Sequence, residues 1–124
     1  MFSGIGRVTV LVDDLDAALR FYRDVLGFVV LHDSTQAGFR YLHVGVAGQP
    51  GVGVWLLPAE SGEIGRQTGD APMLVLYTDD LGPVVAALEK AEVPMWDYRG
   101  DEASESLHFR DPFGNVLIAA RLLG

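Results

Sequence analysis

The sequence has no cysteine and few basic residues. Without cysteine, the chain can form no disulfide, no thiol nucleophile and no thiolate metal site. It has 9 Lys and Arg residues against 17 Asp and Glu residues, which gives a net charge of −8. Binding to nucleic acid requires clustered Lys and Arg to neutralise the phosphates, so nucleic acid is not an expected partner.

Long hydrophobic runs are also absent. The longest apolar run is short and interrupted by glycine, so no segment is expected to span a membrane. The first residues, MFSGIGR, lack the basic start and apolar stretch of a signal peptide. A length of 124 residues, of which 49% are apolar, suits one domain with a core of its own. We therefore expect a cytoplasmic globular protein.

Two parts of the sequence repeat one pattern, in which a strand leads to a pair of aspartates and a helix. In RVTVLVDDL the alternation is typical of a strand, and Asp13 or Asp14 is expected to cap a helix that ends at Gly27. The pattern recurs in MLVLYTDDLGPVV, and strand-like runs follow each helix: FRYLHVGV and GVGVWLLP, then PMWDY, SLHF and NVLIAA. The sequence therefore predicts two βαβββ modules, over residues 1–66 and 67–124, joined by the Gly-rich and polar segment 61–70.

The patterns VDDLDAALRFYRDVLGF and TDDL, with the closing FRDPFGN, resemble the vicinal oxygen chelate superfamily. That superfamily includes glyoxalase I, extradiol dioxygenases, fosfomycin-resistance enzymes and bleomycin-resistance proteins. The resemblance covers nearly the whole chain. It implies an α+β fold in which two βαβββ modules form an open, cup-shaped mixed sheet with helices on the outer face. It also implies a homodimer, because single-chain members of this length usually pair.

Metal-dependent members of the superfamily hold their ion with four side chains, and the resemblance places three of these positions on Arg7, Met73 and Ile118. The fourth falls within residues 52–58, where the run GVGVWLLP contains no His, Glu, Gln or Asp. A guanidinium repels a cation, a thioether is a poor ligand for hard divalent ions, and isoleucine has no donor atom. We therefore expect neither a metal nor another cofactor.

Alternation along the strands predicts which side chains line the cup. A largely apolar surface with a few polar groups is typical of a pocket for an organic ligand, although such a face can also be ordinary core or be covered by a partner subunit. The cup-facing residues expected from alternation are Arg7, Thr9 and Leu11 on the first strand, Met73, Val75 and Tyr77 on its counterpart, and Val116, Ile118 and Ala120 on the last strand.

The three histidines do not form a metal motif, and each has a different expected role. By its place in SLHFRDP, His108 resembles the catalytic acid–base residue of extradiol enzymes, but a lone histidine is more often structural. His43 alternates with Phe39 and Tyr41, so it lines the cup or packs beneath a loop. His32 is expected to be exposed after the end of a strand.

Aromatic and acidic residues supply further candidates. Trp55 and Trp96 occupy strands in matching modules, with Tyr98 near the second, and aromatic walls hold planar or cationic ligands. Core or dimer packing is the alternative for either tryptophan. The loop RGDEASES, residues 99–106, forms either the rim of the cup or a solvated acidic loop. In the DPFG turn, Asp111 and Asn115 are expected to shape the turn rather than to catalyse.

These observations favour a metal-independent small-molecule-binding protein that sequesters an aromatic or cationic organic ligand, such as an antibiotic or natural product. This function resembles that of the drug-sequestering resistance proteins. One alternative is a metal-free enzyme in which Arg7 stabilises an oxyanion and His108 is the general base. Another is a metal-dependent lyase or dioxygenase with unusual ligands. The expected ligand-binding residues are Arg7, Thr9, Tyr41, His43, Trp55, Met73, Tyr77, Trp96, Tyr98, His108 and Ile118.

Overall fold

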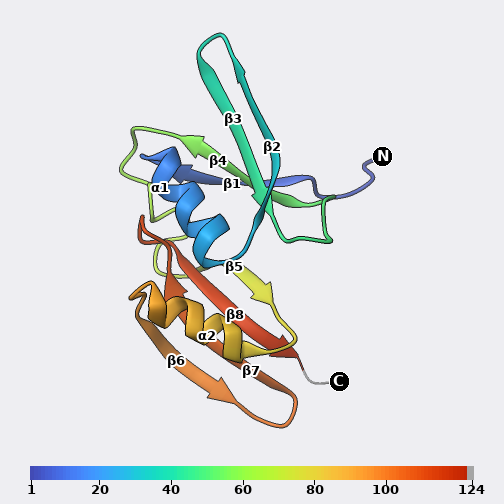
Figure 1. Ribbon diagram of the computed structural model, residues 1–124, viewed down its shortest axis with the longest axis vertical. Helices are drawn as coiled ribbons and strands as arrows, with labels where there is room; N and C mark the ends of the chain where they lie inside the picture. The colour runs from blue at the N-terminus through green and yellow to red at the C-terminus, as the bar shows by residue number, and fades with distance from the viewer. Residues whose placement is uncertain (123–124) are drawn as a thin grey trace. The chain divides into compact units, whose positions relative to one another are not determined.

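The computed structural model describes residues 1–122, which divide into two compact units (Figure 1). The first unit is Met1–Ser61, and the second begins at Gly62. Within the described residues, no helix is long and apolar enough to cross a membrane.

The first unit contains one helical segment and a sheet of four strands. Strand β1 (Arg7–Val12) leads into helix α1 (Leu15–Leu19), which continues as the π-helical segment η1 (Arg20–Val25). The strands β2 (Val29–Gln36), β3 (Phe39–Gly45) and β4 (Gly53–Pro58) follow. The sheet has the order β1-β4-β3-β2, in which β1 and β4 are parallel and the other neighbours are antiparallel.

The second unit repeats this arrangement. Strand β5 (Pro72–Tyr77) precedes helix α2 (Leu81–Lys90), and β6 (Met95–Gly100), β7 (Ser104–Arg110) and β8 (Val116–Leu122) follow. Its sheet has the order β5-β8-β7-β6, with β5 and β8 parallel. The repeated βαβββ topology confirms the predicted fold class.

Both helices begin at the aspartates that the sequence marks. The carboxylate of Asp14 accepts a hydrogen bond from the backbone N–H of Ala17 at 3.0 Å, and that of Asp80 accepts one from the N–H of Gly82 at 2.9 Å. Of the two caps considered for the first helix, Asp14 is the one used. Such caps satisfy N–H groups that have no partner within the helix. The first helical segment is followed by Gly27 at φ 76°, the left-handed conformation that glycine adopts without strain.

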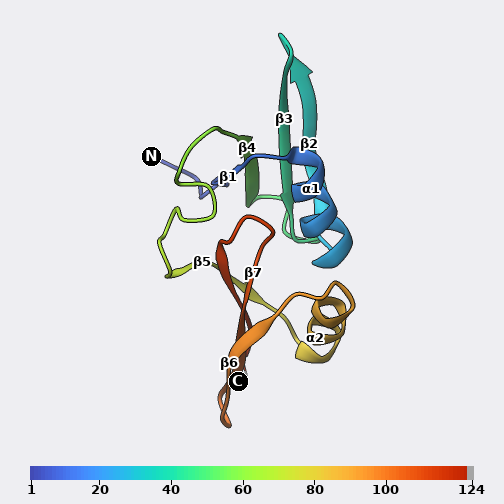
Figure 2. The same cartoon turned by 90° about the vertical axis from the view of Figure 1, so that its left-hand side faces the viewer.

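Each sheet packs its helix against one face, and this face forms the core. In Figure 2, α1 and η1 lie beside the sheet of the first unit and α2 beside that of the second. Alternate strand residues point to opposite faces of a sheet, so the residues between the buried ones lie on the side without the helix. Buried residues at alternate strand positions are Val10, Val12, Leu42, Val44, Val54 and Leu56 in the first unit, and Leu107, Phe109, Leu117 and Ala119 in the second.

The turn between β7 and β8 is held by Asp111, as the DPFG pattern predicts. Its carboxylate accepts hydrogen bonds from the backbone N–H groups of Phe113 and Asn115 and from the Asn115 side-chain amide, at 2.8 to 3.0 Å. Asp111 and Asn115 are both buried. Gly65 packs against the same turn, where a Cβ would lie 1.8 Å from the carbonyl oxygen of Phe113. These contacts give Asp111 and Asn115 a structural role.

Candidate functional site

Five of the expected ligand-binding residues lie together on the helix-free face of the first unit, the side of its sheet opposite α1. Strand register pairs Thr9 with Trp55 and Trp55 with His43. The rings of Tyr41 and Trp55 are stacked, with centroids 6.3 Å apart and planes 20° apart. The His43 ring meets Trp55 edge-on at 6.0 Å. These side chains and Arg7 are all half-buried, so each remains partly accessible.

A hydrogen bond joins Arg7 to His43 at this face. The Arg7 Nε–H donates to His43 Nδ1 at 3.0 Å, and Nη1 donates to the Gly6 carbonyl at 2.7 Å. Burial lowers the pKa of His43, and the nearby charges of Arg7 and His32 lower it further. Because Nδ1 accepts a bond, the neutral ring carries its proton on Nε2. The face therefore presents a guanidinium next to an imidazole N–H.

His32 lies on the same face and corrects an expectation. It lies inside β2 rather than after a strand end, because the strand continues to Gln36. A bulge between Val30 and His32 brings His32 into register with His43. The two rings are 5.2 Å apart, and His32 Nε2 is 2.9 Å from Ser34 Oγ. The expected exposure of His32 is confirmed.

The side chain of Leu31 packs over Gly45 and Gly53 at the edge of this face. This contact was not predicted from the sequence. A Cβ added at Gly45 or Gly53 would lie 2.7 or 2.5 Å from Leu31 Cδ1. The Leu31 side chain therefore occupies space that only glycine leaves free. Strand register places Gly53 beside Arg7. The sequence feature that could have indicated this close approach is the glycine at alternate positions in GVGVW, because glycine within a strand often marks such a contact.

The second unit gathers other expected residues on its own helix-free face. Strand register connects Val75 to Ile118, Ile118 to His108 and His108 to Trp96. The rings of Trp96 and His108 are 5.6 Å apart. Alternation places Tyr77 with Val75 on β5, and Tyr77 is 70% exposed. Met73 is half-buried and lies at a register shift between Pro72 and Leu74, so alternation does not assign its face. Val116 and Ala120, the other two residues of β8 that were expected to face the cup, are buried.

His108 and Trp96 each have a charged neighbour. Within residues 1–122, His108 Nδ1 is buried without a hydrogen bond and lies 3.8 Å from Asp97 Oδ2. The Arg110 guanidinium lies 5.2 Å from the centre of the Trp96 ring. Arg110 was not singled out from the sequence, although it follows His108 by two residues on the same strand. Arg7 belongs to the first unit and His108 to the second.

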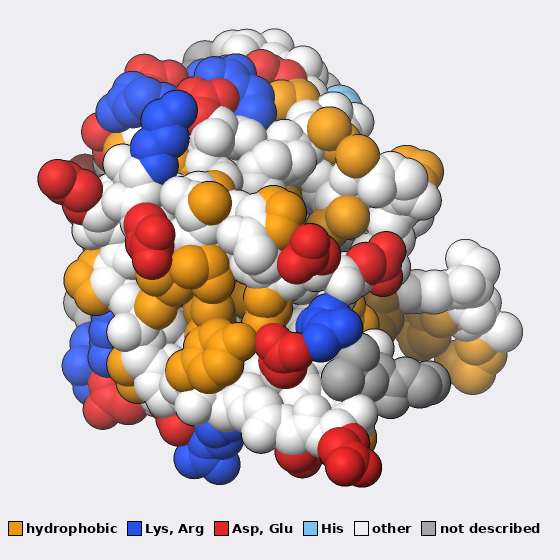
Figure 3. Space-filling model, turned by 60° about the horizontal axis from the view of Figure 1, so that its bottom comes forward, with side chains coloured by type: hydrophobic (Ala, Val, Ile, Leu, Met, Phe, Trp, Pro, Cys, Tyr) orange, Lys and Arg blue, Asp and Glu red, His pale blue; other side chains and the backbone are white. Residues whose placement is uncertain are grey.

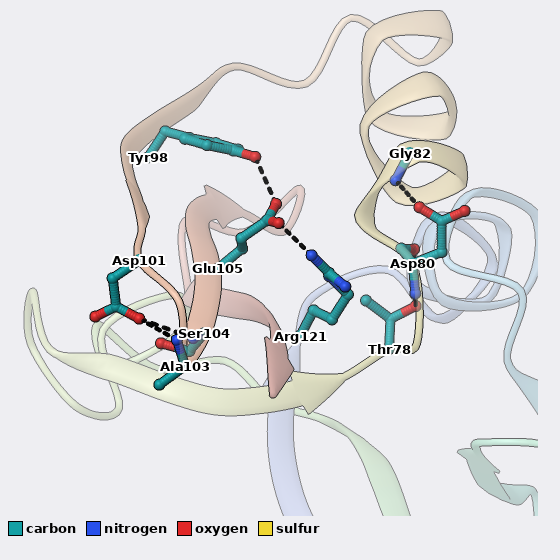
Figure 4. Close-up of polar contacts among 9 residues, drawn as sticks. All are labelled: Thr78, Asp80, Gly82, Tyr98, Asp101, Ala103, Ser104, Glu105 and Arg121. Carbon is teal, nitrogen blue, oxygen red and sulfur yellow. Dashed lines mark hydrogen bonds and ion pairs between the residues drawn. The ribbon is translucent and has the colours of Figure 1, made fainter. Parts of the chain in front are cut away.

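Tyr98 does not join the aromatic group around Trp96. Asp97 adopts φ 52°, and the strand register shifts between Trp96 and Arg99. An irregularity of this kind redirects the residues that follow it. The Tyr98 hydroxyl instead donates to Glu105 Oε2 at 3.0 Å, and Arg121 Nη2 donates to Glu105 Oε1 (Figure 4).

The expected acidic loop at residues 99–106 is a tight hairpin between two strands. β6 extends to Gly100 and β7 begins at Ser104, and the Asp101 carboxylate accepts hydrogen bonds from the N–H groups of Ala103 and Ser104. The hydrogen bonds from Arg121 and Tyr98 lower the pKa of Glu105. Its carboxylate is therefore held by two side chains rather than being merely solvated.

A surface cavity of about 530 Å³ lies at the N-terminal end of α2. Of the expected ligand-binding residues it contains only Tyr98. Tyr98 and Arg121 donate hydrogen bonds to Glu105, and Asp80 caps the helix (Figure 4). A neighbouring hollow of about 440 Å³ includes Tyr77. The lining residues of the larger cavity are Asp79, Asp80, Leu81, Gly82, Val85, Tyr98, Glu105 and Arg121.

A model of the Glyoxalase/Bleomycin resistance protein/Dioxygenase superfamily matches residues 4–118. The chain belongs to this superfamily. No curated protein matches its sequence.

Solved structures of the superfamily and of related proteins share the fold. UcmS2 is 27% identical with a TM-score of 0.80, and the match covers 97% of this chain and 98% of that one. A glyoxalase/bleomycin resistance protein from Streptomyces sp. CB03234 is 25% identical with a TM-score of 0.73, over 94% and 98% of the two chains. TnmS3, an antibiotic-binding protein from the same strain, is 24% identical with a TM-score of 0.80, over 98% and 97%. The likeness to TnmS3 shows the fold alone.

The residues at the superfamily's expected metal positions do not fit a divalent ion. Arg7 donates two hydrogen bonds and carries a positive charge, while Met73 and Ile118 offer no oxygen or imidazole donor. Strand β4, with the sequence GVWLLP, supplies no side-chain ligand for a hard cation. In residues 1–122, no group of three or more His, Asp and Glu side chains is placed to hold a metal ion.

Proposed function

We propose that the protein binds a small organic ligand without a metal and acts by sequestering that ligand rather than converting it. The observation that carries the proposal is the pair of stacked rings, Tyr41 and Trp55, beside the hydrogen-bonded Arg7 and His43. Stacking on an aromatic side chain contributes roughly 0.5–1.5 kcal/mol beyond the area that it buries. Four half-buried side chains on adjacent strands thus combine apolar contact with polar groups, as sites for organic ligands do.

Trp55 adds a second argument for a ligand at this face. Its indole Nε1 is buried and has no hydrogen-bond partner in the described chain. A buried donor left unpaired costs about 1–3 kcal/mol. A ligand oxygen that reaches Nε1, after the side chains covering it move, would accept this hydrogen bond and recover the cost. The antibiotic-binding activity of TnmS3, which has the same fold, supports a natural product as the ligand.

The α2 cavity is the weaker site for a sequestered ligand. Arg121 and Tyr98 already bond to Glu105, and Asp80 caps the helix. A ligand there would compete with these bonds for the same groups. On the helix-free face, by contrast, Trp55 Nε1 has no bond to give up within residues 1–122.

A metal-free enzyme is the second candidate, favoured by the environment of His108. Asp97 Oδ2 lies 3.8 Å from His108 Nδ1, and a carboxylate near one ring nitrogen can orient a histidine for proton transfer. Turnover of a bound compound that disappears in His108→Ala, while the variant remains folded, would establish it. Binding without turnover in the unmodified protein would contradict it.

We also propose that two copies of the chain form a homodimer. Exposed apolar side chains in the second unit support a protein contact, with Val75 52% and Tyr77 70% exposed. Figure 3 shows hydrophobic side chains gathered on the visible face between acidic and basic ones. Patches of this kind mark interaction surfaces. Sedimentation equilibrium is expected to give twice the mass of 13.4 kDa, whereas a monomer at micromolar concentration would refute pairing.

A thermal-shift screen tests the binding proposal. The purified protein is heated with planar natural products and with divalent metals, each with and without a chelator. A ligand that binds only the native state raises the midpoint by mass action. The proposal predicts stabilisation by an aromatic compound that the chelator leaves unchanged. A rise that depends on metal and is reversed by the chelator would favour the metal-dependent alternative.

A further inference from the structure

We propose that the ligand of the helix-free face of the first unit is an aromatic molecule with an anionic oxygen at its edge, such as an aromatic carboxylate, rather than a cation. This inference rests on the proposed function, because it names the chemical class that the same site selects.

The charged or nitrogen-bearing side chains at this face present hydrogen-bond donors, whereas the Thr9 and Tyr41 hydroxyls can donate or accept. Arg7 uses Nε and Nη1 in bonds to His43 and Gly6, and its Nη2 has no partner within residues 1–122. The neutral His43 ring accepts at Nδ1 and so presents an N–H at Nε2. The Trp55 Nε1–H is buried, so it becomes a further donor when the side chains that cover it move. A guanidinium, an imidazole N–H and an indole N–H together require an acceptor from the ligand.

The strands that form this face supply almost no carboxylate. β1, β3 and β4 contain neither Asp nor Glu, and β2 contains only Asp33. Asp33 pairs in register with the buried residue Leu42, so it lies on the side of the sheet that holds the helix. There it accepts two hydrogen bonds from Arg40, each 2.9 Å long. A ligand cation on the helix-free face would thus meet Arg7 without a compensating acid from the sheet.

The net charge of −8 opposes an anion only at long range. Salt screens such charges over a length of about 8 Å at physiological ionic strength. A carboxylate that contacts Arg7 interacts over hydrogen-bond distance, where charge-assisted bonds are strong. The local guanidinium therefore decides which charge binds, while the rest of the surface mainly slows the approach of an anion.

The stacked rings and the donors lie within reach of one aromatic molecule. Arg7 and Thr9 are two residues apart on β1, which spaces them by about 7 Å along the strand. Thr9 pairs with Trp55, and Trp55 stacks with Tyr41. A flat ring that covers the indole therefore brings a carboxylate at its edge toward the end of the face that holds Arg7 and His43.

Two matched probes test the charge preference by titration calorimetry in the presence of a chelator. 2-Naphthoate and 2-naphthylmethylammonium have the same ring system and opposite charges. We expect 2-naphthoate to bind at least about tenfold more tightly, the ratio that one charge-assisted contact supplies. We also expect Arg7→Gln to abolish the preference and Arg7→Lys to retain part of it. Arg20→Gln removes the same charge from an exposed position and should leave the preference intact.

The outcomes separate this inference from the function on which it rests. Equal affinity of the two probes, or tighter binding of the ammonium, would refute the charge preference and leave metal-free binding standing. If neither probe binds up to its solubility limit, both proposals fail. A preference for 2-naphthoate that is unchanged in folded Arg7→Gln would show that another part of the chain selects the anion, and the assignment to this face would be wrong.

Discussion

Replacing Asp111 with alanine should destabilise the protein far more than the same change at Asp101. Both carboxylates accept two backbone N–H bonds in a turn, but Asp111 is 5% exposed and Asp101 is exposed. Asp111 also accepts a bond from the Asn115 side-chain amide at 2.8 Å. Asp111→Ala therefore leaves three donors unpaired, while water replaces the carboxylate in Asp101→Ala.

The magnitude follows from the burial of these donors. A buried donor without a partner costs about 1–3 kcal/mol. The two Asn115 donors are buried and the Phe113 N–H is half-buried, so losing all three bonds should cost about 3–5 kcal/mol. Urea unfolding followed by tryptophan fluorescence measures the loss. With a slope of about 2 kcal/mol/M, the midpoint should fall by roughly 1.5–2.5 M for Asp111→Ala. For Asp101→Ala we expect a shift below about 0.5 M, as is usual at the surface.

Equal midpoint shifts in the two variants would refute the argument that burial of the hydrogen-bond donors determines the loss of stability. A second result would refute the structural role itself: Asp111→Ala with an unchanged midpoint but no ligand binding would make Asp111 a functional residue. Asp111→Asn is the conservative control, because it keeps one oxygen that can accept a hydrogen bond.

Three further predictions test other parts of the structure. Gly65→Ala should lower the melting temperature by several degrees, because Gly65 has φ 76° and the new Cβ would lie 1.8 Å from the Phe113 carbonyl oxygen. In the control Gly62→Ala, the new Cβ meets no atom within 4 Å, so the melting temperature should change little. The pKa of His43 is lowered in the folded protein, so as the pH decreases the unfolded chain binds a proton before the folded one does. The free energy of unfolding should therefore fall as the pH decreases through the ordinary histidine pKa of about 6.5. A fall of equal size in His43→Gln would contradict this. Glu105 raises the pKa of Tyr98, so ultraviolet titration should show that pKa decreasing in Glu105→Gln, and an unchanged value would show that the hydrogen bond is absent in solution.

The fold could be predicted from the sequence because its signals are local and occur twice. Alternation separates Val10 and Val12, which are buried, from Arg7 and Thr9, which are half-buried on the other face. The aspartate caps and Gly27 mark the helix boundaries through side-chain and backbone preferences that do not depend on distant contacts. The DPFG turn was also predictable for this reason.

Parts of the site could not be predicted because strand irregularities break the alternation. The bulge before His32 brings it beside His43, and the register shift after Trp96 directs Tyr98 to Glu105. Neither irregularity has a clear sequence signal: Asp97 adopts a positive φ without being glycine. The bond between Arg7 and His43 joins residues on different strands, so its existence depends on a register that the sequence does not display.

The central claim is that an aromatic ligand binds at Trp55 without a metal, and its most direct test is the indole N–H resonance of that residue. The chain has two tryptophans, so the spectrum of Trp96→Phe assigns the Trp55 signal. During titration of the ¹⁵N-labelled protein with 2-naphthoate in the presence of a chelator, we predict a saturable shift of the Trp55 indole signal. A Trp55 signal that stays in place while calorimetry records binding, or that moves only after a divalent metal is added, would contradict the account.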